Sequence, residues 1–220
     1  MLFFFKKNSR TVNQDDILVD DDDDQQDNEK KCTCLTVWRK SLVFSCKGFT
    51  VIGSDGNLVY RVDNYSGRPG RVILMDGSGN PILTMFRRKK LGLVDNWFIF
   101  EGEVDDCSRN KKCNKKTGKK PIFVVRKNLN ILQRNSNVLA YVYRGICQKR
   151  YSYVIEGSYG HRSCKVLDES RRVLAEIKKK EAMMGSGISF GLEVFLLIVH
   201  PGFDSGFAMS LILLLDQMFS

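Results

Sequence analysis

The stretch Asp204-Ser-Gly-Phe-Ala-Met-Ser-Leu-Ile-Leu-Leu-Leu-Asp-Gln-Met218, near the end of the 220-residue chain, decides the fold. In residues 207–215 only Ser210 is polar, so a helix here is apolar on every side and must be enclosed by protein or lie in a membrane. This apolar run is far shorter than the ~20 residues that span a bilayer. Asp204 can cap the start of the helix, and Asp216 returns a charge near its end. The sequence therefore predicts a helix buried inside the protein.

Upstream of this helix, short segments rich in β-branched and aromatic residues predict strands. Three strand–turn–strand units have similar lengths, with turns at residues 53–57, 76–80 and 168–172. In the first of these turns an Asp-Gly pair supplies the positive φ angles that tight hairpins need. Together with the other segments the chain offers about a dozen strands. The other candidates are residues 35–40, 96–101, 122–126, 138–143, 151–155 and 189–199.

So many strands predict a curled or closed sheet, because exposed edges invite pairing with other chains. No convincing amphipathic helix interrupts the strands, and residues 169–180, helical in composition, belong to the third hairpin. Closure around the terminal helix would satisfy both parts of the chain at once. We therefore predict a mainly β fold, a closed antiparallel barrel of about twelve strands around a buried hydrophobic C-terminal helix.

Charge divides the chain into two parts. Residues 1–31 carry a net charge of −4 and include an acidic run at 20–24, whereas residues 32–220 carry +14. Low hydrophobicity and dense like charge predict a disordered acidic tail over residues 1–31, followed by one barrel domain over residues 32–220. The basic domain favours anionic partners, either phospholipid head groups or nucleic acid, although such charge can also serve solubility alone.

The cysteines and the N-terminus bear on location. The apolar run at residues 2–5 is too short for the core of a signal peptide, so we do not expect secretion. Seven scattered cysteines, an odd number, do not form a disulfide framework and fit a reducing compartment. We expect a cytoplasmic protein, with a peripheral membrane or nuclear location as further options. We also expect a monomer, with other proteins as additional partners.

Several segments in order resemble the plant LURP-one-related proteins. They begin with Leu35-Thr-Val-Trp-Arg-Lys and include Leu74-Met-Asp-Gly-Ser-Gly-Asn-Pro-Ile-Leu-Thr and Val199-His-Pro-Gly-Phe-Asp. The resemblance covers about residues 35–219 and leaves the acidic tail outside. No single segment is specific, but their ordered combination is. The remaining matching segments are residues 48–51, 56–65 and 214–218.

This resemblance implies a tubby C-terminal-like fold, a twelve-stranded barrel closed around a hydrophobic C-terminal helix. It also implies kinship with phospholipid scramblases and with tubby-like, membrane-tethered transcription regulators, and a role in plant defence. Tubby domains proper bind phosphoinositides. Their lysine-and-arginine lipid site has no matching motif here, so phosphoinositide binding is an expectation from fold alone.

The densest cationic segment is residues 109–120, which joins two predicted strands and is expected to form an exposed loop. Near an anionic membrane each base can contribute ~1 kcal/mol. The same run suits nuclear import or non-specific nucleic-acid binding, and a solvated loop without a ligand is the plainer interpretation. We hypothesise that it lies at one end of the barrel with the basic runs 87–90 and 178–180. The candidate anion-binding residues are Arg87, Arg88, Lys89, Lys90, Arg109, Lys111, Lys112, Lys115, Lys116, Lys119 and Lys120.

Catalytic and metal-binding motifs are weak, so we expect neither enzyme activity nor a cofactor or metal. The closely spaced cysteines, Cys32 with Cys34 and Cys107 with Cys113, lack the paired spacing of zinc sites. A catalytic Cys–His pair assembled in space stays open, since His161 and His200 are available. His200 is better interpreted as a structural hydrogen-bonding group. Three cysteines are assigned to apolar strands as core residues: Cys46, Cys147 and Cys164.

We interpret the chain as a non-enzymatic binding or scaffold protein that is recruited to anionic phospholipid surfaces. The alternative is a nuclear regulatory protein that uses the basic loop for import or non-specific nucleic-acid binding. Specific recognition of DNA is not expected, because the one strong helix is buried. A barrel that holds an acyl chain is also disfavoured, because helix side chains would fill its interior. The central-helix residues assigned to that role are Phe207, Leu211, Ile212, Leu214, Leu215 and Met218.

Overall fold

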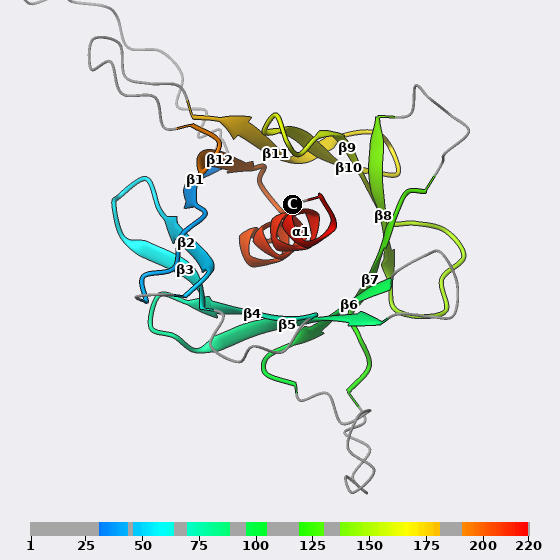
Figure 1. The fold of residues 1–220 in the computed structure, drawn as a ribbon. Helices are drawn as coiled ribbons and strands as arrows, with labels where there is room; N and C mark the ends of the chain where they lie inside the picture. Colours follow the sequence, from blue (N-terminus) through cyan, green and yellow to red (C-terminus); the bar gives the residue numbers. More distant parts are fainter. Residues whose placement is uncertain are drawn as a thin grey trace, which may run out of the picture. The chain divides into compact units, whose positions relative to one another are not determined.

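A computed structural model describes residues 31–43, 46–63, 70–88, 96–104, 119–129, 137–180 and 191–219. In these residues twelve strands form one closed antiparallel barrel, and one helix runs through its middle (Figure 1). The predicted fold class, with its strand number and its enclosed helix, is confirmed. The predicted acidic tail, residues 1–31, lies outside the described residues except for Lys31 and stays a prediction.

The strands follow one another around the barrel in the order of the sequence, and the first closes against the last. Their bounds are Thr33–Trp38 (β1), Gly48–Ile52 (β2), Leu58–Asp63 (β3), Arg71–Asp76 (β4), Pro81–Arg88 (β5), Asn96–Glu101 (β6), Phe123–Lys127 (β7), Val138–Arg144 (β8), Tyr153–Ser158 (β9), Ser163–Asp168 (β10), Val173–Lys179 (β11) and Val194–Val199 (β12), and the helix α1 spans Ser205–Phe219.

Closure of the barrel depends on β12, the apolar strand that precedes the helix. It pairs with β1 from Thr33↔Val199 to Trp38↔Val194, and with β11 on its other side. Alternate side chains of a strand point to opposite faces, and Phe195, Leu197 and Val199 are at most 2% exposed. These side chains belong to the core cluster that surrounds the helix.

Helix α1 is enclosed over most of its length, from Gly206 to Asp216. The Asp204 carboxylate caps its start by accepting a hydrogen bond from the Phe207 N–H at 2.6 Å. The buried Ser210 hydroxyl donates to the Phe207 carbonyl oxygen at 2.7 Å, so its polar group is satisfied inside the helix. In the parts of the chain that the structure describes, no helix has both the length and the hydrophobicity to cross a bilayer.

The barrel has two ends, which we name after the first and last residues of β1. Odd-numbered strands finish and even-numbered strands begin at the Trp38 end, and the reverse holds at the Thr33 end. Helix α1 follows β12, so it starts near the Thr33 end and finishes near the Trp38 end. Lys127, the last residue of β7, accordingly donates from Nζ to the carbonyl oxygen of Met218 at 2.8 Å.

The three predicted hairpins share one device, an aspartate whose carboxylate accepts hydrogen bonds within the turn. The Asn57 N–H lowers the pKa of Asp55, the Asn80 side-chain amide lowers that of Asp76, and the Arg172 N–H lowers that of Asp168. These pKa values fall because the hydrogen bonds stabilise the charged form of each carboxyl group. These turns hold β2 to β3, β4 to β5 and β10 to β11 in register.

Some boundaries and cysteine assignments differ from the sequence prediction. β9 starts at Tyr153 and not at Tyr151, although the Ser152 N–H still donates to the Val142 carbonyl oxygen. Cys164 is buried in β10, as predicted. The assignment of Cys46 and Cys147 to core strands is wrong: both lie outside strands, Cys46 is partly exposed and Cys147 is exposed. Apolar neighbours misled the assignment, because a segment that joins strands can be apolar and still face solvent.

Leu214→Asp should abolish soluble folding, because Leu214 is fully buried in α1 and an unpaired buried charge costs several kcal/mol. This cost is comparable with the ~5–15 kcal/mol total stability of a domain. The matched control is Ile146→Asp, since the Ile146 side chain is exposed. Soluble yield and thermal unfolding of both variants provide the measurement. Cooperative unfolding of soluble Leu214→Asp protein would contradict the enclosed helix.

Acid should destabilise the protein partly through the hairpin aspartates. Their folded-state pKa lies below the unfolded value, so their stabilisation is present above about pH 4 and is lost as pH falls through the folded-state pKa. Asp168→Asn should therefore reduce the fall in Tm between pH 5 and pH 3. Glu169→Gln, in the same turn, removes an exposed carboxyl and serves as the control. An unchanged pH dependence in Asp168→Asn would remove Asp168 from this account.

Candidate functional site

The end of helix α1 meets a buried polar cluster at the Trp38 end. Asp216 is only 7% exposed, and a carboxylate near a helix C-terminus is unfavourable to the helix dipole. The Arg39 Nε lies 2.9 Å from Asp216 Oδ1, and the Tyr159 hydroxyl donates to the same oxygen at 3.0 Å. Lys127 supplies the positive charge that the last helical turn lacks. Partners from three separate parts of the barrel wall thus fix the helix end.

The same cluster extends to Arg162, whose guanidinium lies between two rings. Its Cζ is 4.3 Å from the centroid of Tyr159 and 4.4 Å from that of Phe195, and its Nε donates to the Leu192 carbonyl oxygen at 2.8 Å. Burial raises the pKa of Tyr159, and the Asp216 charge raises it further, while Arg162 acts in the opposite direction. Tyr159 therefore remains a neutral hydrogen-bond donor at physiological pH, which suits a structural role.

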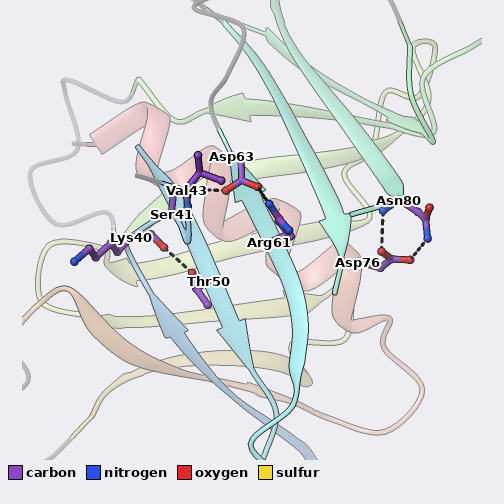
Figure 2. A network of polar contacts seen from close by, with 8 residues as sticks. All are labelled: Lys40, Ser41, Val43, Thr50, Arg61, Asp63, Asp76 and Asn80. Carbon is purple, nitrogen blue, oxygen red and sulfur yellow. Dashed lines mark hydrogen bonds and ion pairs between the residues drawn. The ribbon is translucent and has the colours of Figure 1, made fainter. Parts of the chain in front are cut away.

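The segment that follows β1 is held over β2 and β3 by a second network (Figure 2). The Ser41 hydroxyl donates to the fully buried Asp63 carboxylate and accepts from the Val43 N–H at 3.0 Å. Arg61 Nε donates to the other oxygen of Asp63 at 2.7 Å. The Thr50 hydroxyl donates to the Lys40 carbonyl oxygen at 2.7 Å. The backbone that carries Lys40 and Leu42 is thereby fixed, while both side chains face solvent.

A cavity of about 710 Å³ opens beside this network. It forms because β3 and β4 pair only through Tyr60↔Asp76 and Arg61↔Met75, and the strands diverge toward the Trp38 end. Among the described residues, the lining carries equal numbers of cationic and acidic side chains: Arg39, Lys40, Lys47 and Arg71 with Asp63, Glu103, Glu193 and Asp216. Arg39 and Arg71 are in ion pairs with carboxylates of this lining. The balanced charges do not make the cavity itself an anion site.

Apolar side chains gather on the surface of the Trp38 end. The described residues include seven large apolar side chains with high exposure, and five of them lie at this end: Trp38, Leu42, Leu129, Leu192 and Phe219. Exposed cations share the end, including Lys40, whose Nζ is 5.2 Å from the Trp38 ring centroid. Arg88 and Lys179 finish β5 and β11 there. This end therefore combines exposed apolar groups with positive charge.

The structure separates the basic runs that we expected to lie together. Arg87 and Arg88 are exposed at the Trp38 end, whereas Lys119 and Lys120 precede β7 at the Thr33 end. The register shows this separation, because Arg88 pairs with Asn96 while the Lys119 ammonium lies 3.4 Å from the carbonyl oxygen of Glu101. The hypothesis of a single basic end is therefore wrong for Lys119 and Lys120, because β6 runs back along the barrel between them and Arg88. Arg87, Arg88 and Lys179 do share the Trp38 end.

Several predicted site residues fall outside the described residues and keep their status as predictions. They are Lys89, Lys90, Arg109, Lys111, Lys112, Lys115 and Lys116. The predicted central-helix residues lie inside the barrel: Phe207, Leu211, Ile212, Leu214 and Leu215 are buried, and Met218 is partly buried against the core.

The sequence did not indicate the cluster of Arg39, Tyr159, Arg162 and Asp216. Its members come from distant parts of the chain and carry no local motif. The one available signal was Asp216, an acid at the end of an otherwise apolar helix that required a partner. In the described ranges, no group of three or more His, Cys, Asp or Glu side chains is arranged to hold a metal ion.

Comparison with known proteins agrees with this architecture. Protein LURP-one-related 17 of Arabidopsis thaliana is 52% identical to the chain over 193 residues, which covers 86% of this chain and 84% of the relative. Protein LURP-one-related 8 from the same plant is 46% identical over 195 residues, covering 87% and 90%. An X-ray structure of a protein from Arabidopsis thaliana matches the fold with a TM-score of 0.58 and 23% identity, covering 87% of this chain and 93% of that one.

The family profile described as LURP-one-related matches residues 33–216, from the first residue of β1 to the buried carboxylate at the end of α1. The matched region therefore contains every strand of the barrel and the enclosed part of the helix. This chain belongs to the LURP-one-related family.

Proposed function

We propose that this protein is a non-enzymatic binding protein that docks through the Trp38 end of its barrel onto anionic phospholipid surfaces. The observation that carries the proposal is the gathering of exposed apolar side chains and exposed cations at one end of the barrel. Large apolar groups at the rim of a basic surface are typical of proteins that insert shallowly into a membrane interface.

Trp38 and Leu42 carry the apolar part of this proposal. Trp38 is 39% exposed and Leu42 is 54% exposed, and the backbone between them is fixed by Ser41 and Asp63. Because the backbone is already ordered, insertion of these side chains would require little additional ordering. Removal of apolar area from water contributes about 25 cal/mol per Å². The indole ring of a tryptophan also suits the membrane interface, because its apolar ring can face the lipid while its polar N–H faces water.

Arg87, Arg88 and Lys179 carry the electrostatic part, because all three are exposed at the Trp38 end. A base close to an anionic leaflet contributes about 1 kcal/mol, and salt screens this attraction. Neither class of side chain alone gives firm attachment, since stable anchoring takes two signals. The combination supports reversible, salt-sensitive recruitment.

Filling of the barrel by its own helix supports a binding role over lipid transport. Residues Gly206 to Asp216 occupy the interior that an acyl chain would need. No described contact bears on the role in plant defence that the resemblance implies, so that role remains an expectation. The same holds for nuclear import or nucleic-acid binding through residues 109–120, and this alternative becomes one arm of the binding experiment.

Reversal of two charges at the Trp38 end should weaken membrane binding. We expect Arg87→Glu with Arg88→Glu to lower binding to phosphatidylcholine vesicles containing phosphatidylserine by on the order of 30-fold, from the loss of two favourable charges alone. The matched control, Lys119→Glu with Lys120→Glu, makes the same change in net charge at the opposite end. Co-sedimentation at several salt concentrations measures the difference.

Equal losses in both double variants would show that net charge and not the Trp38 end governs binding. A further variant changes the predicted basic loop and carries Lys111→Ala, Lys112→Ala, Lys115→Ala and Lys116→Ala. If vesicle binding falls only in the control or only in this loop variant, the docking surface lies elsewhere. Tighter binding of the wild type to an oligonucleotide than to the vesicles at equal salt would favour the nuclear alternative. Thermal unfolding of each variant checks that the fold is intact.

Removal of apolar groups at the Trp38 end should weaken binding in a way that added salt does not reproduce. Trp38→Ala with Leu42→Ser keeps the net charge but removes two exposed apolar side chains. We expect weaker vesicle binding with an unchanged dependence on salt. In the wild type, Trp38 fluorescence should shift to the blue on vesicle addition. Trp97 is buried in the core and provides the internal fluorescence reference. Full vesicle binding by this variant would reject apolar insertion.

A further inference from the structure

Three reactive or titratable side chains meet on the outer face of the barrel near the Thr33 end. They come from three consecutive parts of the wall: Cys32 precedes β1, His200 follows β12, and Glu176 lies in β11. The register places them together, because Thr33 pairs with Val199 and Val199 pairs with Ala175. This cluster is separate from the Trp38 end and from the anionic-surface function proposed above.

The distances arrange these side chains in a chain of contacts. Cys32 Sγ lies 3.7 Å from His200 Nδ1, and His200 Nε2 lies 3.5 Å from Glu176 Oε1. Burial opposes ionisation of Glu176, but hydrogen bonds from Lys178 and His200 outweigh it and lower the pKa of the carboxyl. An ionised Glu176 can only accept a hydrogen bond, so the contact assigns the ring hydrogen of His200 to Nε2. Nδ1 is then free to accept the thiol proton of Cys32.

The cluster is open to small reagents. Cys32 is exposed, and the His200 side chain is 35% exposed. The backbone of His200 is fixed independently of its ring, because its N–H donates to the Leu174 carbonyl oxygen at 2.9 Å. A thiol, a base and an orienting carboxylate in this order match the arrangement that activates cysteine nucleophiles. Contacts somewhat longer than ideal are usual for such sites without a ligand.

We propose that Cys32 is a site of reversible thiol modification, activated by His200 and Glu176, and that its reaction partner is an anionic low-molecular-weight disulfide. In the reaction the Cys32 proton passes to His200 Nδ1. The Cys32 sulfur then forms a bond with one sulfur of the disulfide, and the original S–S bond breaks. The departing thiolate takes the proton from His200. Cys32 is oxidised to a mixed disulfide, and half of the reagent is reduced to a thiol.

The charges around the cluster favour an anionic reagent. Lys165 lies opposite Glu176 in the β10–β11 register, and Lys178 Nζ contacts Glu176 Oε2 at 3.2 Å. Lys31 precedes the thiol in the chain. Glu176 is the one carboxylate in direct contact with His200 within the described residues. Lys165 also lies opposite Glu156, whose carboxylate pairs with Arg171. Three lysines and one arginine therefore accompany two acids that are already paired, and this imbalance should attract the carboxylates of glutathione disulfide more than a cationic disulfide.

The experiment treats the full-length protein with glutathione disulfide and follows each cysteine by peptide mass spectrometry. Cys147 and Cys34 are exposed and serve as internal reference thiols. Burial raises the pKa of Cys164 to about 11, so its modification reports unfolding. At pH 7 we expect Cys32 to react on the order of tenfold faster than Cys147, with a shallower dependence on pH between 6 and 8. With cystamine, a cationic disulfide, Cys32 should react no faster than Cys147.

His200→Gln should bring the rate and the pH profile of Cys32 to those of Cys147, and Glu176→Gln should have a smaller effect in the same direction. His200→Gln removes the base and Glu176→Gln removes the group that positions it, while both variants leave the thiol itself in place. A merely structural role of either residue would not move the pH profile. Equal rates for Cys32 and Cys147 in the wild type would overturn the proposal. So would an unchanged Cys32 rate in folded His200→Gln protein. Vesicle binding by His200→Gln should be normal, which separates this test from that of the proposed function.

Discussion

Burial of one apolar helix is the constraint on which the rest of the structure depends. Helix α1 presents apolar side chains on all sides, so no single sheet face could cover it and the strands must close around it. Enclosure creates a second requirement, because the ends of a buried helix carry unsatisfied backbone groups. Asp204 supplies the acceptor at the start, and Lys127 supplies the donor at the end. The barrel and the helix therefore stabilise each other and neither is complete alone.

The enclosed helix also explains why polar clusters lie at the Trp38 end. The helix finishes there with a carboxylate, Asp216, that cannot be buried without partners. Arg39 reaches it from the segment after β1, and Tyr159 reaches it from the segment after β9. The same end is where β3 and β4 diverge and where the segment after β1 folds over β2. Fixed surface groups at this end are thus a by-product of closing the barrel over the helix.

The two ends of the barrel differ in chemistry because they solve different structural problems. The Trp38 end must cover the helix terminus and exposes apolar groups among cations. Near the Thr33 end, the turn between β12 and α1 places His200 beside the start of the chain's first strand. The surface that we propose for an anionic membrane and the thiol that we propose for an anionic disulfide therefore lie toward opposite ends. Neither needs space in the barrel interior, which the helix fills.

The sequence by itself determined the fold class, the approximate strand number, the three hairpins and the burial of α1, because hydrophobic pattern and turn chemistry act locally. It could not determine which charges share an end, since that depends on the direction of each strand around a closed barrel. Arg88 and Lys119 illustrate the point, because one intervening strand sets them apart. Likewise, Cys32 and His200 are separated by 168 positions in the chain. Only the pairing of β1 with β12, which closes the barrel, brings the Cys32 thiol next to the His200 ring.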